Sequence, residues 1–212
     1  QSNQFYFDAQ RKPIINSSGY HGYLLEFNDK GQVSQKTWIN PYGQPTLFKK
    51  YSYAQLRYKY DQYGNVQEES HYDPQGQPAY GKQGWHKAVS RYDQNGNCIE
   101  DRFYSPNGQL ESAQFSRSAI IKRKFNPRKQ YLEVAHFDEK VRSTLAKQGY
   151  HIRKMKYDDW GLELERQFFD TEGKLFNHPT KGYARLVNEY VRGKKVKSET
   201  FDQDGKLLET VE

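Results

Sequence analysis

Three histidines recur at one interval, since the step along the chain from His21 to His86 equals the step from His86 to His151. Imidazoles that come close together can bind a metal ion or titrate near neutral pH. Halfway between them, and again after the last, the chain carries alanine at Ala54, Ala119 and Ala184. Large residues that alternate with small ones are typical of interdigitated core layers. The pattern therefore predicts that these histidines pack in a core, and a ligand role is the less favoured reading.

Four glutamates recur in the same manner at Glu68, Glu100, Glu133 and Glu165. Paired carboxylates at roughly 5 to 10 Å could perform glycosidase chemistry. Catalysis needs one special site, however, and a residue repeated in four places is better explained as structural. On a covered strand face each carboxylate needs a partner, because an unpaired buried charge is costly. We expect those partners to be Tyr hydroxyls, His or Arg of neighbouring repeats.

Trp38, Trp85 and Trp160 are predicted to lie in or near turns. Exposed aromatic rings beside Lys, Arg, Asn and Gln suit the binding of sugars or peptides, and single-stranded nucleic acid as a weaker option. No nucleic-acid-binding motif accompanies them. The favoured reading is nevertheless that they fill the ends and edges of a thin core. The tryptophans, the histidines and the glutamates together form the set of candidate binding residues.

Other chemistry is not indicated by the sequence. One Cys and one Met are too few for a disulfide framework or a Cys-based metal site, and Cys98 reads as a small core residue. There is no Ser-His-Asp order, phosphate loop or nucleophile elbow. We therefore expect no catalytic residue, no metal and no cofactor, and we expect that the protein is not an enzyme.

The candidate residues all sit on a repeating framework. A residue that is mostly aromatic, followed by Asp, Asn or Ser, opens a short turn every 32 or 33 residues, at Asp8, Asn40, Asp73, Ser105, Asp138, Asp170 and Asp202. Self-similarity at a fixed period indicates a repeat architecture. The Asp or Asn side chain caps the turn, and a Gly three residues later supplies a positive φ angle.

Each repeat carries a second turn, at Asn28, Asp61, Asp93, Asn126, Asp158 and Val191. About eight residues lie between turns, enough for one ordinary strand, and residues 54–60 alternate between apolar and polar as an antiparallel strand does. No segment has a sustained helical period. The best helix candidate, residues 138–146, aligns with a first turn and is read as a degenerate turn.

The repeats are of two kinds. From the first turn to the next strand the even repeats are longer than the odd repeats by a single residue, so the true period is a pair of unlike repeats, about 65 residues. We predict a single all-β domain over 1–212, an antiparallel β-hairpin array of about two dozen short strands in a curved or spiral sheet. Its units are approximately 5–37, 38–70, 71–102, 103–135, 136–167 and 168–200, followed by a C-terminal cap at 201–212. Residues 1–7 and 205–212 are predicted to be end strands or caps.

Two segments, YKYDQYGNVQEESHYDPQGQP (58–78) and SRYDQNGNCIEDRFYSPNGQ (90–109), resemble the tyrosine–aspartate (YD, or Rhs-type) repeats of bacterial surface and toxin proteins. The resemblance implies a β-strand spiral in a secreted or surface setting. The strict spacing and the lack of a toxin-like extra domain argue against a shell that encloses a toxin, and six units are few for a large shell.

The charge and the hydropathy of the chain further limit the classes of function that the sequence supports. The net charge is +7, but the 33 Lys and Arg are interspersed with 26 carboxylates, so no basic block stands out. No apolar run is long enough to span a membrane. Because the chain begins at Gln1, we expect that a signal sequence or a larger N-terminal part has been removed.

The leading expectation is a non-enzymatic, extracytoplasmic binding or scaffold module, in the periplasm, at the cell surface or secreted. Its partner would be a protein, a polysaccharide or cell-wall material, with nucleic acid unfavoured. One alternative is an immunity-type partner that neutralises a secreted toxin. Another is a carbohydrate-active enzyme with a groove between repeat layers.

Overall fold

The computed structural model describes residues 3–212, and over these residues the protein is all-β, with antiparallel strands and no helix. The strands are β1 (Gln4–Phe5), β2 (Gly22–Phe27), β3 (Val33–Ile39), β4 (Gln55–Tyr60), β5 (Val66–Tyr72), β6 (Lys87–Tyr92), β7 (Cys98–Tyr104), β8 (Ile120–Phe125), β9 (Tyr131–Phe137), β10 (Ile152–Tyr157), β11 (Glu163–Phe169), β12 (Arg185–Val191), β13 (Lys194–Phe201) and β14 (Leu207–Val211). The predicted fold class is confirmed. The described residues contain no helix that could cross a membrane.

The predicted number of strands is wrong, because 14 strands form in residues 3–212 instead of about two dozen. After each first turn except the one at Asp202, the chain makes one isolated bridge to the preceding strand, such as Ile39↔Pro45 or Tyr72↔Pro78, and then leaves the sheet. In the first three connections the bridging residue is a proline, which cannot donate to a strand ladder. The residues between a first turn and the next strand therefore form a long connection rather than a strand.

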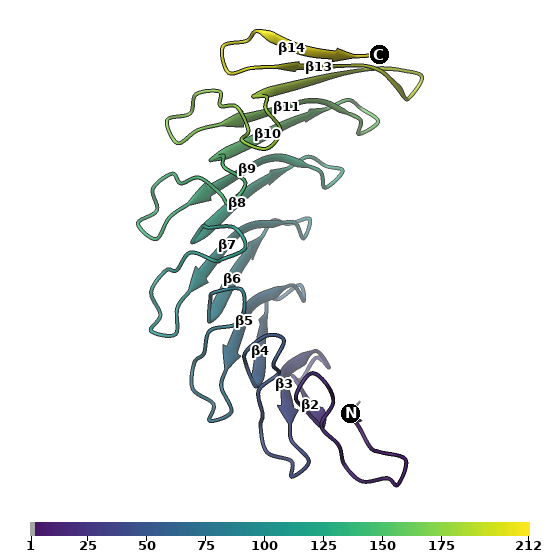
Figure 1. The fold of residues 1–212 in the computed structure, drawn as a ribbon, viewed down its shortest axis with the longest axis vertical. Coiled ribbons are helices and arrows are strands. Elements are labelled where there is room, and N and C mark those ends of the chain that lie inside the picture. Colours follow the sequence, from purple (N-terminus) through teal and green to yellow (C-terminus); the bar gives the residue numbers. More distant parts are fainter. Residues whose placement is uncertain (1–2) are drawn as a thin grey trace. The chain divides into compact units, whose positions relative to one another are not determined.

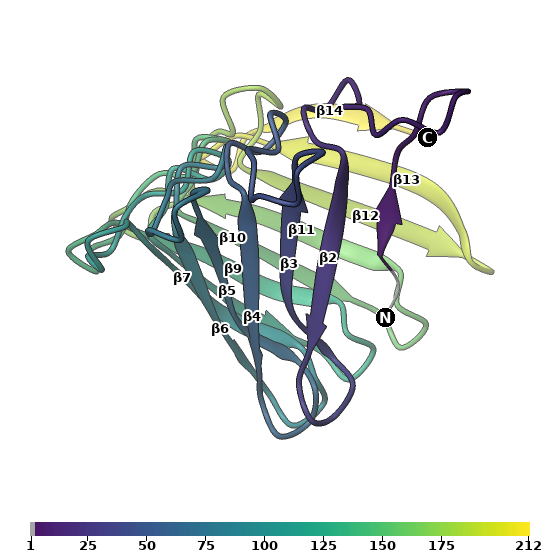
Figure 2. The ribbon, with the colours of Figure 1, turned by 90° about the horizontal axis from the view of Figure 1, so that it is seen from below.

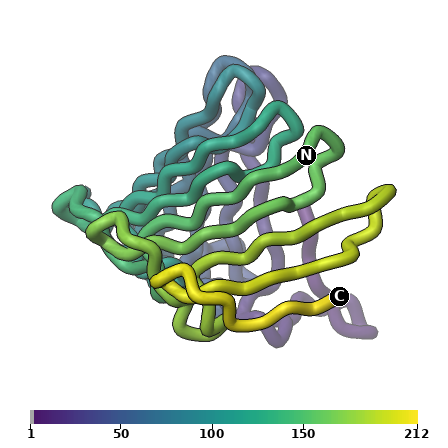
Figure 3. Tube along the Cα trace, turned by 90° about the horizontal axis from the view of Figure 1, so that it is seen from above, coloured from purple at the N-terminus to yellow at the C-terminus, as the bar shows by residue number. Residues whose placement is uncertain are grey.

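The chain forms two compact units, the first comprising residues up to 91 together with 102–114, and the second comprising 92–101 together with 115–212. Within each unit the strands lie in chain order, and each pairs with the strands before and after it. In Figures 1 and 2, β2 to β5 of the first unit lie side by side. Figure 3 shows the hairpins of the second unit as a tube, with the C-terminal end in yellow. Strand β7 is divided between the units.

The turns form as their chemistry predicts. In the β4–β5 turn, the Asp61 carboxylate accepts hydrogen bonds from the backbone N–H groups of Tyr63 and Asn65, both at 2.9 Å. Gly64 of that turn has φ +90°. The first turns use the same device, since Asp73 accepts from Gln75 at 2.9 Å and Gln77 at 2.8 Å. Both families of turn are thus capped by a side chain and completed by a left-handed residue.

The segment 138–146 forms such a turn, as predicted, but carries Val141 where most repeats carry glycine. Val141 has φ +62° and a half-exposed side chain. A β-branched residue is strained in this region of backbone space. Replacing Val141 by Gly should stabilise the protein by about 0.5–1 kcal/mol, after allowance for the extra freedom of glycine in the unfolded chain. Urea unfolding monitored by circular dichroism measures the change.

The matched control is Gly173→Val in the following first turn, where φ is +81° and nothing lies within 4 Å of an added Cβ. Because this variant places valine where glycine adopts the left-handed conformation, it should destabilise the protein by a similar amount. Equal stability of wild type and Val141→Gly would contradict the strain argument.

The alternation between shorter odd repeats and longer even repeats arises in the long connections. In the first repeat the connection closes with a tight turn in which Asn16 N–H donates to the Tyr20 carbonyl at 2.9 Å. In the second repeat the equivalent bond runs from Phe48 N–H to the Tyr53 carbonyl at 2.8 Å and encloses one residue more. Gly19 (φ +93°) supplies the left-handed residue in the shorter turn, and Ser52 (φ +66°) supplies it in the longer one. Odd and even repeats are therefore built differently, as the sequence predicts.

Successive connections are joined by backbone hydrogen bonds. These run from Lys49 N–H to the Ser18 carbonyl (3.1 Å), from Lys82 to Tyr51 (2.9 Å), from Gln114 to Gln83 (2.8 Å) and from Lys147 to Ser116 (2.8 Å). Each bond links an odd connection to an even one. Three of these bonds form a ladder alongside the strands of the first unit, and the fourth joins two connections of the second unit.

The core lies between one face of the sheet, called here the core face, and these connections. In the first unit Trp38 and Leu56 of the core face pack with Tyr53 and Phe48 of a connection. In the second unit Phe168 is the largest fully buried side chain, and it contacts the rings of Tyr150 and His178. The connections thus supply the second layer that a sheet needs to bury its apolar face.

The ends of the array agree with the prediction of end strands, because β1 lies within residues 1–7 and β14 lies within residues 205–212. Residues 1 and 2 lie outside the described part of the chain. The second turn of the last repeat, which lacks the motif, is a two-residue hairpin turn with Arg192 at φ +50° and Gly193 at φ +77°. Two consecutive left-handed residues are what the shortest hairpin turns require. The β12–β13 turn is therefore shorter than the other hairpin turns.

Candidate functional site

The four repeated glutamates all lie on the sheet face opposite the core face, which we call the charged face. Lysines stand directly across the hairpins from three of them: Lys59 lies 2.9 Å from Glu68, Lys124 lies 3.0 Å from Glu133, and Lys156 lies 2.6 Å from Glu165. Lys122 lies 3.9 Å from Glu100. The carboxylates therefore have partners, but lysine is the main one, where the sequence analysis expected Tyr, His or Arg.

Glu165 has the densest surroundings of the four. Arg185 donates to it at 2.6 Å, and Gln167 donates to it at 3.0 Å. Burial alone would raise the pKa of Glu165, but the hydrogen bonds and charges of Lys156 and Arg185 hold that pKa below its ordinary value. A glycosidase acid needs the opposite shift, because it must hold a proton at neutral pH. The environment of Glu165 is that of a fixed anion.

From the second repeat onward, the charged face of each unit also places a cation over an aromatic ring. The rings are the residues that open the first turns, and the pairs are Arg57 over Tyr72 (3.8 Å), Lys87 over Tyr104 (5.2 Å), Lys122 over Phe137 (5.1 Å), Lys154 over Phe169 (4.9 Å) and Arg185 over Phe201 (5.3 Å). A cation within about 6 Å of a ring centroid is attracted to the ring face. Ring, cation and carboxylate thus recur together along this face.

These cations were not predicted from the sequence. Lys154 stands three residues after His151, whereas Arg185 stands one residue after Ala184. Both positions point to the same face of a strand, since side chains alternate with period two. A search for a basic residue at one fixed position would fail, but a search for a basic residue on one strand face in every repeat would have found the series.

The three repeated histidines are buried, as predicted. Each ring stands edge-on to the aromatic residue that opens a first turn, with centroid distances of 5.3 Å from His21 to Phe7, 5.3 Å from His86 to Tyr72 and 5.4 Å from His151 to Phe137. Burial is the main reason that the pKa of His86 is lowered.

His21 and His86 precede β2 and β6, which are four strand spacings apart, or about 19 Å, so they cannot share a metal ion. Residues 3–212 contain no group of three or more His, Cys, Asp or Glu side chains placed to hold a metal. The geometry of the histidines is thus that of packed side chains.

Two of the three tryptophans are buried. Trp38 and Trp85 are each only 4% exposed, in agreement with the favoured reading that they fill a thin core, so their rings are not available for binding. Trp38 lies two residues before a first turn, on the core face, and Trp85 lies in a connection that folds onto that face. Trp160 is 81% exposed at the tip of the β10–β11 turn, as expected of a binding residue.

Histidines that the sequence analysis did not single out take the place of aromatic core residues. His71 stacks between the rings of Tyr53 and Trp85, with both centroids at 4.3 Å. His136 lies at the equivalent position two repeats later and accepts or donates a hydrogen bond of 3.0 Å with the Ser118 hydroxyl. The sequence does indicate this role, because His71 and His136 occupy the place in the repeat that Trp38 occupies in the first repeat pair.

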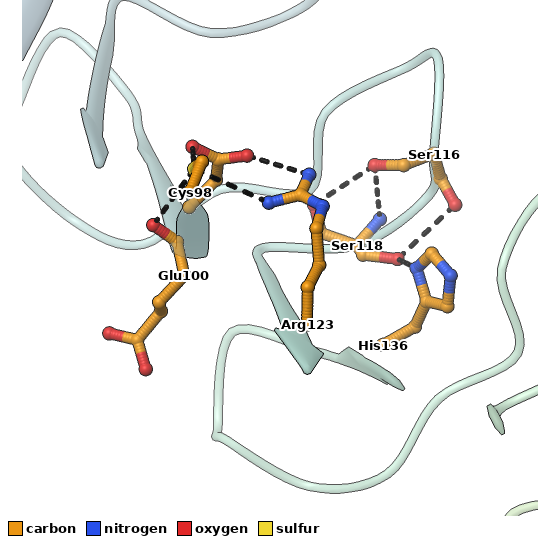
Figure 4. A network of polar contacts seen from close by, with 7 residues as sticks. Cys98, Glu100, Ser116, Ser118, Arg123 and His136 are labelled. Atoms are coloured by element: carbon orange, nitrogen blue, oxygen red, sulfur yellow. Dashed lines mark hydrogen bonds and ion pairs between the residues drawn. The ribbon is translucent and has the colours of Figure 1, made fainter. Parts of the chain in front are cut away.

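Figure 4 shows the polar network around His136 and, beside it, the Arg123 guanidinium. Arg123 forms an ion pair of 2.7 Å with Asp101 and donates to the Cys98 sulfur at 3.5 Å. Cys98 is thus half-buried in a polar group of side chains rather than in an apolar core. Burial, followed by the charges of His151, Arg123 and Arg153, lowers the pKa of His136 to about 4.

The buried His136 predicts a loss of stability in acid. Its pKa is about 4 in the folded protein and about 6.5 when unfolded, so between these values the unfolded chain binds a proton that the folded chain does not. Stability should therefore fall as the pH drops from 6.5 toward 4, and His136 should contribute a loss of about 2 kcal/mol between pH 7 and pH 5. Urea unfolding at the two pH values measures this.

The matched variant is His136→Phe, because Phe103 and Phe168 fill the same position in neighbouring repeats. The variant should lose the part of the pH dependence that comes from His136. It should keep the part that comes from His86 and His178, because burial also lowers the pKa values of these two residues. An identical pH dependence in wild type and His136→Phe would disprove the assignment.

Two recesses lie between consecutive hairpin turns, at equivalent places in the two units. The recess of the first unit, about 340 Å³, is lined by polar residues that include Asn28, Lys30, Gln32 and Asp61. That of the second unit, about 440 Å³, is lined by Asp158, Trp160, Leu162, Tyr190, Arg192 and Gly193. Trp160 and Leu162 stand where the first recess has Lys30 and Gln32. The same groove is thus polar in one unit and largely apolar in the other.

No protein-family model matches the chain, and no curated protein matches it in sequence. The resemblance to YD or Rhs-type repeats therefore stays a prediction.

Solved structures of toxin complexes are similar at low level. A Tc holotoxin pore structure of Photorhabdus luminescens has 11% identity and a TM-score of 0.34, over 87% of this chain and 10% of that one. A TcdB2–TccC3 complex without its hypervariable C-terminal region has 11% identity and a TM-score of 0.36, over 89% and 9%. The chain spans about a tenth of the length of these proteins, and no function is carried over from them.

Proposed function

We propose that the chain is a non-enzymatic binding or scaffold module that works outside the cytoplasm and holds a protein partner on its charged face. The observation that carries the proposal is the recurrence of ring, cation and carboxylate at successive repeats of that face. The extracytoplasmic setting rests on the resemblance to YD or Rhs-type repeats.

The charges support a protein partner more than a neutral polysaccharide. Cations and carboxylates alternate from strand to strand, as the ion pairs of Lys124 with Glu133 and of Lys156 with Glu165 show. The cations themselves stay largely solvated, since the side chains of Lys124 and Lys156 are 69% and 72% exposed. Surface pairs of this kind contribute little to stability, so their positions remain available for recognition. Complementary charge patterns provide specificity and a fast encounter between proteins.

A repeat array suits such a role because it presents equivalent groups at regular spacing. Strands carrying cations lie about 9.6 Å apart along the charged face, at two strand spacings. Rings beneath the cations, such as Phe137 and Phe169, add apolar area at the same spacing. Aromatic residues and Arg are enriched in the energetically dominant parts of protein interfaces.

The test immobilises the wild type and the double variant Lys122→Glu/Lys154→Glu and measures how well each captures candidate partners. The candidates are the proteins encoded beside this one. The double variant reverses two cations of the charged face and should bind the partner at least about tenfold more weakly. The control, Lys147→Glu/Lys181→Glu, makes the same charge change on two exposed residues of the connections and should bind normally. Equal retention by all three proteins would refute a role for the charged face.

A further inference from the structure

The recess at Trp160 differs from its counterpart in the first unit in the residues that line it and in the length of the neighbouring hairpin turn. In other repeats a glutamine reaches across to the next turn: Gln32 donates to the Gly64 carbonyl at 3.4 Å, and Gln130 donates to the Gly161 carbonyl at 2.8 Å. Leu162 takes the place of that glutamine beside the two-residue β12–β13 turn. Leucine cannot make the bond and adds an apolar wall. The recess here has about 440 Å³, compared with about 340 Å³ in the first unit, where Gln32 makes the bond.

The walls of the recess are aromatic and held in place. The hydroxyl of Tyr190 donates to the Glu163 carbonyl at 3.1 Å, which fixes the ring. Trp160 is held through its backbone, because its N–H donates to Asp158 at 3.0 Å, while the indole is 81% exposed. Among the residues at this place in the other hairpin turns, Tyr63 is also a ring facing solvent, at 76% exposed, whereas Lys30, Asn95 and Arg128 are not aromatic. What is particular to this repeat is that Leu162 and a two-residue turn border the recess beside the ring. A volume of several hundred Å³ with apolar walls is typical of a ligand site.

The rim of the recess is positively charged. Arg192 lines it, and Lys194 and Lys195 follow at once on β13, all three exposed. The guanidinium of Arg192 has no ion-pair partner in the described part of the chain. The Asp158 carboxylate is engaged in its own turn, where it accepts from Trp160 and from Leu162 at 2.8 Å. An incoming group would therefore meet more free cations than free carboxylates.

We propose that this recess binds an acidic peptide segment of a partner protein, with one large apolar side chain inserted between Trp160 and Tyr190 and flanking carboxylates on Arg192 and Lys194. The proposal rests on the proposed function, because it names a class of partner, but it concerns a site apart from the charged face. The apolar walls select the anchor side chain, and the cations select the acidic flanks. Sugars and single-stranded nucleic acid also stack on tryptophan, and they are the rival outcomes of the test.

The experiment uses the full chain and a fluorescein-labelled, acetylated peptide, Glu-Glu-Asp-Phe-Asp-Glu-Glu amide, with binding followed by anisotropy. Trp160→Ala should weaken binding at least about tenfold and Arg192→Glu at least about fivefold. Lys30→Ala, at the same place in the polar recess of the first unit, should leave it unchanged. A peptide with Ala for Phe, and one with Asn and Gln for every acid, should each bind at least about tenfold more weakly.

A second readout does not depend on a variant. Trp38 and Trp85 are buried, so Trp160 is the exposed indole, and saturating unlabelled peptide should shift the tryptophan emission of the wild type to the blue. The proposal is overturned by equal binding to Trp160→Ala and wild type, by no binding at about 1 mM peptide, or by tighter binding of oligothymidine or maltohexaose than of the peptide. Lys122→Glu/Lys154→Glu should bind the peptide normally, which separates failure of this site from failure of the charged face.

Discussion

Replacing Phe168 by Ala should destabilise the second unit by about 3–5 kcal/mol, the range for deleting a buried aromatic ring. Phe168 is 1% exposed and contacts three rings: Tyr150 at 5.2 Å, His178 at 4.6 Å and Tyr183 at 6.0 Å between centroids. Two of these rings belong to the same long connection, so the cavity would loosen the contact between sheet and connection. Urea unfolding followed by circular dichroism measures the loss.

The control is Leu164→Ala on the same strand, where the side chain is 36% exposed. Its loss should remain below about 1.5 kcal/mol, because less apolar area leaves the core. If the two variants were equally stable, the core would not lie between the core face and the connections as the structure has it.

Replacing Gly149 by Ala should cost about 2–3 kcal/mol, from two causes that can be separated. Gly149 has φ +88°, which costs an L-residue about 1–2 kcal/mol. In addition, an added Cβ would lie 2.5 Å from Cγ of Pro179 in the next connection, and a proline ring cannot turn aside. The midpoint of thermal or urea unfolding reports the sum.

Gly173→Ala isolates the first cause, since Gly173 has φ +81° and open space where the Cβ would go. Its cost should be about 1 kcal/mol. The difference between the two variants measures the packing of adjacent connections. A difference near zero would mean that the connections are not in contact at this point.

The framework was predictable because it rests on local chemistry. Asp61 with Gly64, and Asp73 with Gly76, fix their turns through bonds to near neighbours in the chain, so spacing alone indicates hairpins. The longer even connections were visible too, as one additional residue. The strand count was not, because whether a segment pairs or leaves the sheet depends on bridges such as Tyr72↔Pro78 that end after one residue.

The candidate sites were predictable only in part, because burial depends on distant residues. Trp38 and Trp160 both read as aromatic residues near turns, yet one is covered by Phe48 and the other by nothing in its unit. The recess at Trp160 is bordered by the shortened turn at Arg192, a departure visible in the sequence as the loss of the motif. What sequence alone could not show is that this loss faces Trp160 across neighbouring hairpins.

The two kinds of connection set a rule for how such an array can change in length. Lys147 of an odd connection donates to Ser116 of an even one, and Gly149 leaves room for the side chain of the next even connection at Pro179. Loss or duplication of a single repeat would bring two connections of the same kind together, one of them without its complementary neighbour. The smallest piece that a gene could gain or lose without such a mismatch is the pair, so arrays of this type should expand and contract through evolution by two repeats at a time.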